Sequence, residues 1–151
     1  QFSSESNKEK TEKFELNELL DEIILKFDND MIKFISGDKI YFNGRKLLVQ
    51  RCLNNLIENS IKFSNLIEIN LQKLKSSILI VVEDNGPGIP IGERENVFKP
   101  FYKIDKSRSE NSSSVGLGLS ISSDIIRSHG GKIDLSDSKM GGLKVIISLP
   151  F

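Results

Sequence analysis

The feature that most limits how this chain can fold is an apolar run that ends on a carboxylate. Residues 76–84, SSILIVVED, have the β-branched composition of a buried strand, and the last of them, Asp84, is followed at once by Asn-Gly-Pro-Gly. A strand end needs a turn, and Asn-Gly or Pro-Gly supplies one. A turn with a capping aspartate is the simpler interpretation. A turn alone explains neither the carboxylate nor the two glycines around one proline, so this corner is the first candidate for a binding site.

Three helices are indicated by apolar residues that recur at helical spacing. Residues 14–27 carry such a stripe, with Asn17 as a candidate N-cap. A long helix is expected from about residue 44 to residue 63, because its apolar residues share one face at about 100° per residue. A third helix is expected to start at Gly116 and to end before the glycine pair at 130–131. The apolar face of the long helix comprises Val49, Leu53, Leu56, Ile57 and Ile61.

Strand patterns fill most of the intervals between these helices. Residues 99–114 are the exception, because they are polar, rich in serine and without an apolar period, and such long loops are usually lids or disordered. The predicted organisation is therefore one α/β layer pair over residues 14–151, and residues 1–13 read as a linker or a cut end. Strands are expected at 31–35, 39–42, 66–74, 76–84, 132–137 and 143–150, with a short helical piece near 92–98.

Composition narrows the classes of function. The 151 residues suit one domain with a core of ordinary size. Lys and Arg number 21, as do Asp and Glu, so the zero net charge does not indicate nucleic acid or a membrane surface as a partner. The single cysteine, Cys52, excludes an internal disulfide framework and fits a reducing compartment. No apolar stretch approaches the ~20 residues of a membrane span, which says little about a longer parent protein.

The long helix carries a polar stripe opposite its apolar face. Asn55, Asn59 and Lys62 stand at i, i+4 and i+7 and share a face, with Glu58 close beside them. A solvated face is the ordinary interpretation, but asparagine is unfavourable inside a helix, so two on one stripe need a reason. An amide oxygen suits Mg²⁺ when substrate phosphates supply the negative charge. Lys62 can pair with those phosphates, and Phe63 can offer its ring face to a base.

Asp84 is chemically suited to read adenine. A fixed carboxylate accepts a hydrogen bond from the exocyclic amino group of adenine, whereas guanine presents a carbonyl at that position and is repelled. Gly86 and Gly88 let the backbone approach a flat base closely.

A phosphate-binding end is indicated further along the chain. Gly116 and Gly118 open a helix, and helix N-termini attract phosphate through free N–H groups and the dipole, although a lone Gly-x-Gly is weak evidence. Lys103 and Arg108, in the long polar segment, can reach the phosphates as a lid closes, although ordinary loop charges explain them about as well.

As a set, these segments resemble the ATP-binding catalytic domain of bacterial sensor histidine kinases, within the gyrase–Hsp90–kinase–MutL ATPase fold. The resemblance extends over about residues 14–151 and includes the closing SHGGKI and GGLKVIISLP. It implies an α+β fold, a two-layer sandwich with a mixed sheet of about five strands packed on three helices. The matching motifs are the N box at 55–63, the G1 box at 84–88, the F box at 98–101 and the G2 box at 116–119.

The resemblance also implies a role for each matching residue. Asn59 is the Mg²⁺ ligand, with Asn55 close to the metal and phosphates, and Lys62 contacts phosphate. Asp84 binds the adenine amino group. Phe63 lies beside the adenine or ribose. The remaining ATP-binding residues are Gly86 and Gly88 near the base, Lys103 and Arg108 in the lid, and Gly116, Leu117, Gly118 and Leu119 around the triphosphate.

The function implied is that of an ATP-dependent protein-histidine kinase, restricted to its catalytic domain. Such a domain binds Mg·ATP and donates the γ-phosphoryl group to a histidine on the separate dimerisation domain of the same kinase, which passes it to a response regulator. The implied parent is homodimeric and anchored in the inner membrane, with this domain in the cytoplasm and no nucleic-acid partner. The tail is reminiscent of osmosensor-type kinases.

The only histidine, His129, stands at the end of a predicted helix, where a dipole partner or cap neighbour is the ordinary interpretation. The resemblance places no phosphoacceptor there, and the chain contains no His-Glu/Asp-x-x-x-Pro motif. We therefore expect the catalytic half of a kinase without its acceptor half.

Two other functions remain open on the residues alone. A hydrolytic ATPase of the same fold uses a glutamate four residues before the metal-binding Asn, a position held here by Asn55, which cannot act as a base. A nucleotide-gated binding module or a serine kinase of the anti-sigma type fits the short length, whereas the F box and long lid favour the histidine kinases. The chain departs from the family at residues 113–115, Ser-Ser-Val instead of Gly-Gly-Thr, and at Lys103, where Arg is common.

Overall fold

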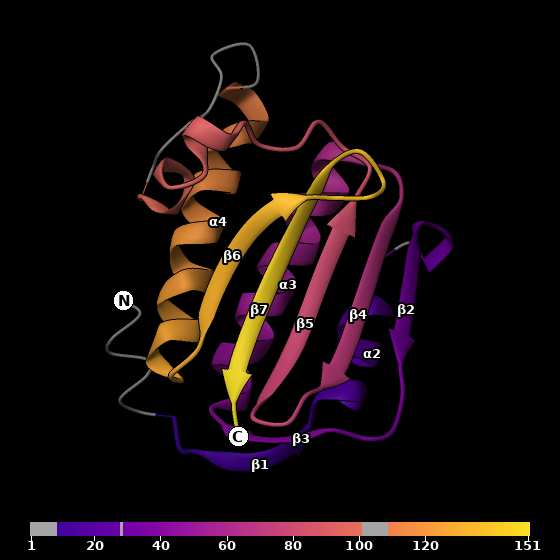
Figure 1. The fold of residues 1–151 in the computed structure, drawn as a ribbon, viewed down its shortest axis with the longest axis vertical. Helices are drawn as coiled ribbons and strands as arrows, with labels where there is room; N and C mark the ends of the chain where they lie inside the picture. The colour runs from indigo at the N-terminus through magenta and orange to yellow at the C-terminus, as the bar shows by residue number, and fades with distance from the viewer. Residues whose placement is uncertain (1–8, 28, 101–108) are drawn as a thin grey trace.

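Strand β5, Ser77–Asp84, lies in the middle of a five-stranded sheet with the order β2-β4-β5-β7-β6 (Figure 1). Strand β2 runs parallel to β4, and the other neighbours are antiparallel, so the sheet is mixed as expected. The computed structural model describes residues 9–27, 29–100 and 109–151. The other strands of the sheet are β2 (Ile32–Ser36), β4 (Ile67–Lys73), β6 (Lys132–Asp137) and β7 (Leu143–Pro150).

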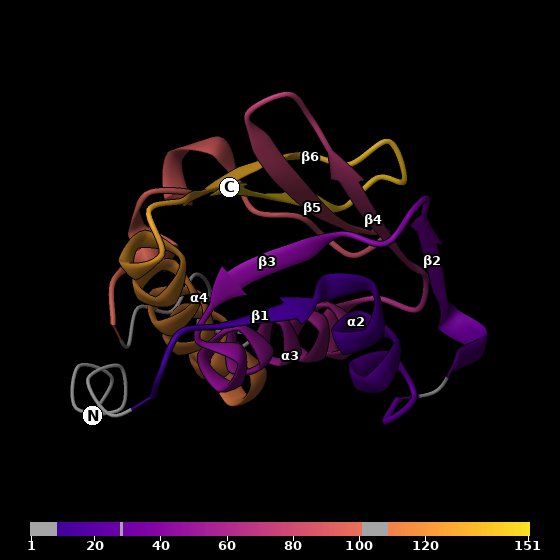
Figure 2. The ribbon, with the colours of Figure 1, turned by 90° about the horizontal axis from the view of Figure 1, so that it is seen from below.

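Helices cover one face of this sheet, and Figure 2 shows the sheet and the helices as two layers. Alternate residues of β5, namely Ile78, Ile80 and Val82, are buried, as are Leu53 and Ile57 on the longest helix. Burying each such side chain stabilises the fold by roughly 1.5–3 kcal/mol. The two-layer α+β prediction is confirmed. The helices in the described part are α2 (Leu16–Ile24), α3 (Lys46–Phe63) and α4 (Ser109–Ser128), with 3₁₀ turns η1 (Asn29–Met31), η2 (Ile91–Glu93) and η3 (Asn96–Phe98).

A two-stranded ribbon, formed by β1 (Glu12–Glu15) and β3 (Tyr41–Gly44), lies at the lower end of the layers in Figure 1. Only one of its two strands is predicted by the sequence. Strand β3 was expected, but its antiparallel partner β1 was not. Two residues assigned to the linker, Glu12 and Lys13, are therefore paired in β1. Residues 1–8 lie outside the described part, so the domain boundary itself stays a prediction.

The prediction that Asn17 caps the first helix is wrong. Helix α2 begins at Leu16, and Glu15 occupies the N-cap position. Asn17 is buried inside the first turn, where its Oδ1 accepts a hydrogen bond from the Ile40 N–H (2.7 Å) and its Nδ2 donates to the Asp38 carbonyl (3.3 Å). The Asn17 side chain therefore attaches the loop before β3 to α2 and does not cap its own helix.

Helix α4 packs against α3 through small buried side chains. The Ser122 hydroxyl donates to the Cys52 carbonyl oxygen (3.3 Å), and the Cys52 thiol donates to the Ser122 carbonyl (3.8 Å). Burial raises the pKa of Cys52 to about 12, so this thiol is a packing group and not a nucleophile. The close approach fixes Leu119 on α4 relative to the second half of α3.

Candidate functional site

A pocket lies at the upper end of the two layers in Figure 1, where β5 and α3 both end. It contains about 460 Å³ of space between its atoms, part of it open to solvent. Its polar side chains are Asn59, Ser60 and Asp84. Its apolar wall includes Leu56, Pro87, Ile89, Leu119, Leu143 and Val145.

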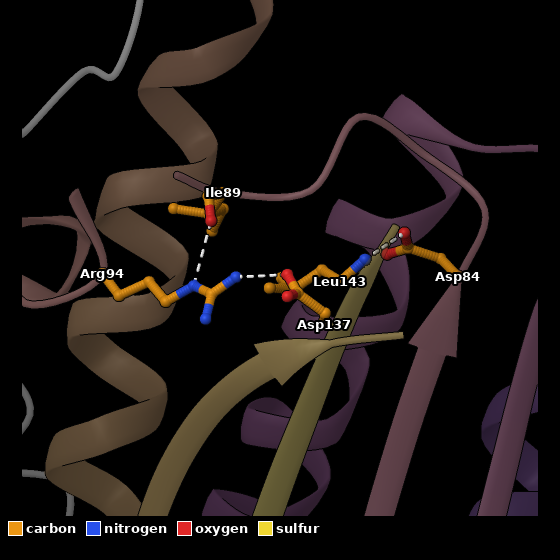
Figure 3. Close-up of polar contacts among 5 residues, drawn as sticks. All are labelled: Asp84, Ile89, Arg94, Asp137 and Leu143. Carbon is orange, nitrogen blue, oxygen red and sulfur yellow. Dashed lines mark hydrogen bonds and ion pairs between the residues drawn. The ribbon is translucent and has the colours of Figure 1, made fainter. Parts of the chain in front are cut away.

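Asp84 is the last residue of β5, and its carboxylate is held firmly at one oxygen. Oδ1 accepts hydrogen bonds from the backbone N–H groups of Gly86 (3.0 Å) and Leu143 (3.0 Å), the second of which is drawn in Figure 3. Among the described residues, none donates a hydrogen bond to Oδ2. Because the side chain is only 5% exposed and lines the pocket, Oδ2 is the oxygen available to a ligand.

Two glycines are packed so closely around Asp84 that no other residue fits there. A Cβ on Gly86 would stand 2.6 Å from the Phe63 carbonyl oxygen, and a Cβ on Gly142 would overlap Asp84 Oδ1. Gly88 serves a different purpose, because its φ of +72° lies in the left-handed region. The Gly-x-Gly after Asp84 therefore brings the end of β5 against both α3 and the turn before β7.

Asn59 has an unmet hydrogen-bonding need. Helix α3 places it on the pocket wall, and its Nδ2 is buried without a hydrogen-bond partner among the described residues. An unpartnered buried amide costs about 1–3 kcal/mol. A ligand that offers oxygen atoms, or a cation that takes the amide oxygen after the side chain turns over, would meet this need.

The described residues fit a metal that arrives with its substrate better than one held by protein alone. No group of three or more His, Cys, Asp or Glu side chains in the described part could hold a metal ion. Mg²⁺ keeps several waters and binds through one or two protein ligands plus substrate phosphates. One neutral amide oxygen, from Asn59, is consistent with that mode.

The pocket unites several residues predicted from separate segments. Asn59, Phe63, Asp84, Gly88 and Leu119 all line it, and the Gly86 N–H bonds the Asp84 carboxylate behind it.

Other predicted residues are placed differently. Asn55 is half-buried on α3 outside the pocket lining, and Lys62 is exposed and lines a neighbouring polar hollow with Ser64, Asn65 and Asn85. Lys103 and Arg108 lie outside the described residues. Leu117 lies on α4, but its side chain lies outside the described part.

The expectation that Gly116 starts a helix is wrong. Helix α4 begins at Ser109, so Gly116 and Gly118 lie inside it. Residues 109–115 contain no proline, and each glycine inside a helix costs only about 1 kcal/mol relative to alanine. The two glycines are therefore tolerated inside α4. Segment 109–114, which we expected to belong to a loop, is therefore helical.

Sequence reasoning missed several residues that shape the pocket. Leu143 supplies both a side chain to the wall and an N–H to Asp84. Asn85 clamps the loop after α3, because its Oδ1 accepts from the N–H groups of Asn65 and Leu66 (both 3.1 Å) and its Nδ2 donates to Asn65 Oδ1 (2.7 Å). The glycine pair at 141–142 could have pointed to Leu143, since such pairs often mark close backbone approach.

Known proteins share this fold and sequence pattern. A family model described as "Histidine kinase-, DNA gyrase B-, and HSP90-like ATPase" matches residues 44–151. Sensor histidine kinase CpxA of Escherichia coli K12 is 37% identical over 108 residues, which are 71% of this chain and 24% of CpxA. The chain thus spans about a quarter of the length of that curated relative.

Solved structures of histidine kinases have the same architecture. The catalytic domain of histidine kinase ThkA matches with a TM-score of 0.79 at 27% identity, covering 93% of this chain and 95% of that one. ThkA in complex with the response regulator protein TrrA matches with a TM-score of 0.77 at 26% identity, covering 93% of this chain and 41% of that one.

Proposed function

Because this chain belongs to the family of histidine kinase-, DNA gyrase B- and HSP90-like ATPases, we propose that it binds Mg·ATP and donates the γ-phosphoryl group to a histidine. The acceptor lies on a separate dimerisation domain of the same sensor kinase, which then passes the phosphoryl group to a response regulator. Two similar proteins support this assignment, since CpxA is a sensor histidine kinase and ThkA is a histidine kinase solved in complex with a response regulator protein.

The observation that carries the proposal is the carboxylate oxygen Oδ2 of Asp84, which is available to a ligand in a mostly apolar pocket. A purine base is flat and apolar on its faces, and the apolar walls from β7, α3 and α4 suit those faces. Adenine carries an amino group at its edge, which can donate to Oδ2 while Oδ1 stays bound to the backbone. A fixed acceptor in a desolvated slot discriminates strongly against a ligand that presents another acceptor.

The phosphates lie on the Asn59 side of the pocket in this proposal. Asn59 holds Mg²⁺, with Asn55 nearby, and the bound ion neutralises part of the charge on the phosphates. Lys62, Lys103 and Arg108 contact phosphate oxygens. Residues 116–119 pass close to the triphosphate.

Transfer is favoured over hydrolysis, because neither Glu58 nor Asn55, the two candidates near Asn59 in the sequence, is suited to act as a general base at the pocket. Glu58 is exposed and is not among the residues that line the pocket. The position four residues before Asn59 holds Asn55, whose amide cannot accept a proton from water. Among the described residues, only Asp84 lines the pocket with a carboxylate, and in this proposal its Oδ1 is held by two N–H groups while its Oδ2 accepts from the adenine amino group.

Within this proposal the domain works in the cytoplasm as part of a homodimeric, membrane-anchored sensor kinase. In the described residues, no helix has both the length and the apolar character that a membrane crossing requires.

Calorimetry with Mg·ATP and a transfer assay test the proposal together. We expect saturable binding of ATP by this chain alone and transfer of label from [γ-³²P]ATP to the parent's dimerisation domain when it is supplied. Steady release of phosphate without that acceptor would favour a hydrolase. Absence of nucleotide binding would contradict the proposal altogether.

A further inference from the structure

Arg94 connects two segments that shape the pocket without lining its apolar wall itself. It stands between η2 and η3, where its Nε donates to the Ile89 carbonyl oxygen (2.9 Å) and its Nη2 donates to Asp137 Oδ1 (2.6 Å), as Figure 3 shows. The Arg94 side chain is only 19% exposed, whereas that of Asp137 is 82% exposed. One guanidinium group therefore joins a backbone carbonyl to a carboxylate from a distant part of the chain.

The two partners of Arg94 belong to two different segments beside Asp84, namely the loop that follows β5 and the end of β6. Ile89 lines the pocket directly after Gly88. Asp137 is the last residue of β6, and the turn after it returns to Leu143, whose N–H bonds Asp84 Oδ1. Because Ile89 and Leu143 both line the pocket, the separation of these two segments affects the width available to a flat base.

The geometry distinguishes this contact from an ordinary surface ion pair, which contributes little to stability. The bond from Nε to the Ile89 carbonyl orients the guanidinium plane before Asp137 is reached. A planar fork with charge-assisted bonds holds two acceptors at a fixed separation, and a lysine ammonium on a flexible stem does not.

We propose that Arg94 is a positioning residue for the base end of the nucleotide. It holds the Ile89 segment at the right distance from Leu143 and the Asp84 carboxylate, so that adenine enters a slot already formed. This inference rests on the proposed function, because it assigns Arg94 a part in nucleotide binding. Arg94 reaches the base through Ile89 and Asp137, so its contribution is the same however many phosphates the ligand carries.

Nucleotide affinity with ligands of increasing charge tests the inference. The dissociation constants of adenosine, ADP and a non-hydrolysable ATP analogue are measured by calorimetry for the wild type, Arg94→Lys and Asp137→Ala. We expect Arg94→Lys to weaken all three ligands by a similar factor of about ten, because one lost charge-assisted bond corresponds to about that change. In the transfer assay, KM for ATP should rise with kcat nearly unchanged, since the base is bound equally in the ground and transition states.

Arg127→Lys is the matched control. Arg127 also pairs with an aspartate, Asp124, at 2.9 Å, but on the exposed surface of α4. Its substitution should change neither the affinities nor the melting temperature appreciably.

Three outcomes would overturn the inference. Unchanged affinity in Arg94→Lys would do so, and so would a loss that grows from adenosine to the ATP analogue, since that pattern marks a phosphate contact. If Arg94→Lys does not fold, Asp137→Ala decides, because that side chain is exposed and alanine removes the acceptor of the Arg94 bond, and unchanged affinity there overturns the inference as well. If the wild type itself binds no nucleotide, the proposed function fails first, so the two failures are distinguishable.

Discussion

At the scale of single residues, Asp84 shows how a carboxylate can be both structural and available. Its Oδ1 is held by the N–H groups of Gly86 and Leu143, which join the end of β5 to the start of β7. Its Oδ2 has no such partner among the described residues. Oδ1 therefore fixes the side chain, and Oδ2 is available to accept a hydrogen bond from a ligand.

The substitution Asp84→Asn should reverse the preference for the base. The amide oxygen can keep the two backbone bonds, which leaves the amide NH₂ facing the pocket and opposite the amino group of adenine. We expect ATP affinity to fall about tenfold to a hundredfold, from the ~1–3 kcal/mol cost of an unmet polar contact. Inosine triphosphate, which presents a carbonyl at the same position, should lose far less or gain.

Calorimetry with ATP and inosine triphosphate measures this ratio, and circular dichroism checks that the variant folds. Asp124→Asn, on the exposed face of α4, serves as the control. Normal ATP affinity in a folded Asp84→Asn variant would refute the role of this carboxylate in reading adenine.

Gly142 should tolerate no side chain, although it looks like an ordinary turn residue. A Cβ there would overlap Asp84 Oδ1 and stand 2.5 Å from the Gly86 nitrogen. We expect Gly142→Ala to lower the free energy of unfolding by about 1–3 kcal/mol and to abolish measurable nucleotide binding. Gly92→Ala, where a Cβ meets nothing within 4 Å, should leave both the denaturant midpoint and binding unchanged. Equal behaviour of the two variants would contradict this close packing.

At the scale of elements, the start of α3 is held by other parts of the chain. Its own N-cap residue, Arg45, makes no side-chain cap bond. Glu9 instead accepts from the N–H groups of Leu47 (2.6 Å) and Leu48 (3.1 Å), and His129 Nε2 accepts from the Arg45 N–H (3.0 Å). The helix that carries Asn59 is thus fixed at its start by residues far from it in sequence.

His129 performs this task in its neutral form. Its Nδ1 lies 2.8 Å from the Ile125 carbonyl oxygen and must donate, and its Nε2 faces an N–H and must accept. Partial burial is the largest effect and lowers the pKa of His129 from its ordinary value of 6.5. The hydrogen bond to the Ile125 carbonyl raises this pKa, the charge of Arg45 lowers it, and the charge of Glu9 raises it. Of the two interpretations of His129, a dipole partner or a cap neighbour, the neutral ring fits the second, because it bonds the Ile125 carbonyl in the last turn of α4 and the Arg45 N–H at the start of α3.

Stability should consequently depend on pH through His129. A lowered pKa in the folded state means that the unfolded chain binds the proton first, so stability present above about pH 6.5 is lost as the pH falls through the folded value. We expect His129→Ala to cost about 0.5–2 kcal/mol at pH 7.5, as for a lost helix cap, and less at pH 5. Urea unfolding of both proteins at the two pH values checks this. A cost that stays constant or grows toward pH 5 would contradict it.

The elements that were predicted correctly are those whose pattern is local. Four residues of the expected stripe, Val49, Leu53, Leu56 and Ile57, are buried and the fifth, Ile61, is partly buried, because periodicity alone determines which face of a helix is apolar. Strand β1 and the tertiary role of Asn17 were missed, since both depend on pairing with residues around β3. The start of α4 was misplaced because glycine was taken as a helix boundary.

At the scale of the whole molecule, five of the predicted site residues line one pocket, because the topology brings the ends of α3 and β5 to the same edge; these are Asn59, Phe63, Asp84, Gly88 and Leu119. Asp84 and Asn59 carry chemistry that can be recognised without coordinates. The contacts that hold them are different, since Arg94 with Asp137 and Gly142 with Asp84 join residues 43 and 58 positions apart, which no local pattern encodes.

This layout separates the only histidine from the pocket. His129 bonds Arg45 at the start of α3, and Phe63 at the end of α3 lines the pocket. The 18 residues of α3 lie between them, which is about 27 Å at ~1.5 Å per residue. Asn59 stands one turn earlier, 14 residues after Arg45, which is about 21 Å at ~1.5 Å per residue. His129 therefore cannot reach a phosphate bound beside Asn59.

The chain alone should thus bind Mg·ATP without labelling itself, and the parent's dimerisation domain should become labelled with acid-labile phosphohistidine when it is added. Asn59→Ala should lower the transfer rate at least a hundredfold, because it removes the proposed metal ligand, whereas His129→Ala should leave the rate within about twofold at pH 7.5. Gel autoradiography before and after acid treatment measures both variants. Self-labelling of the isolated chain that disappears with His129→Ala would show that the acceptor lies within this domain, and the separation of catalytic and acceptor halves would then be wrong.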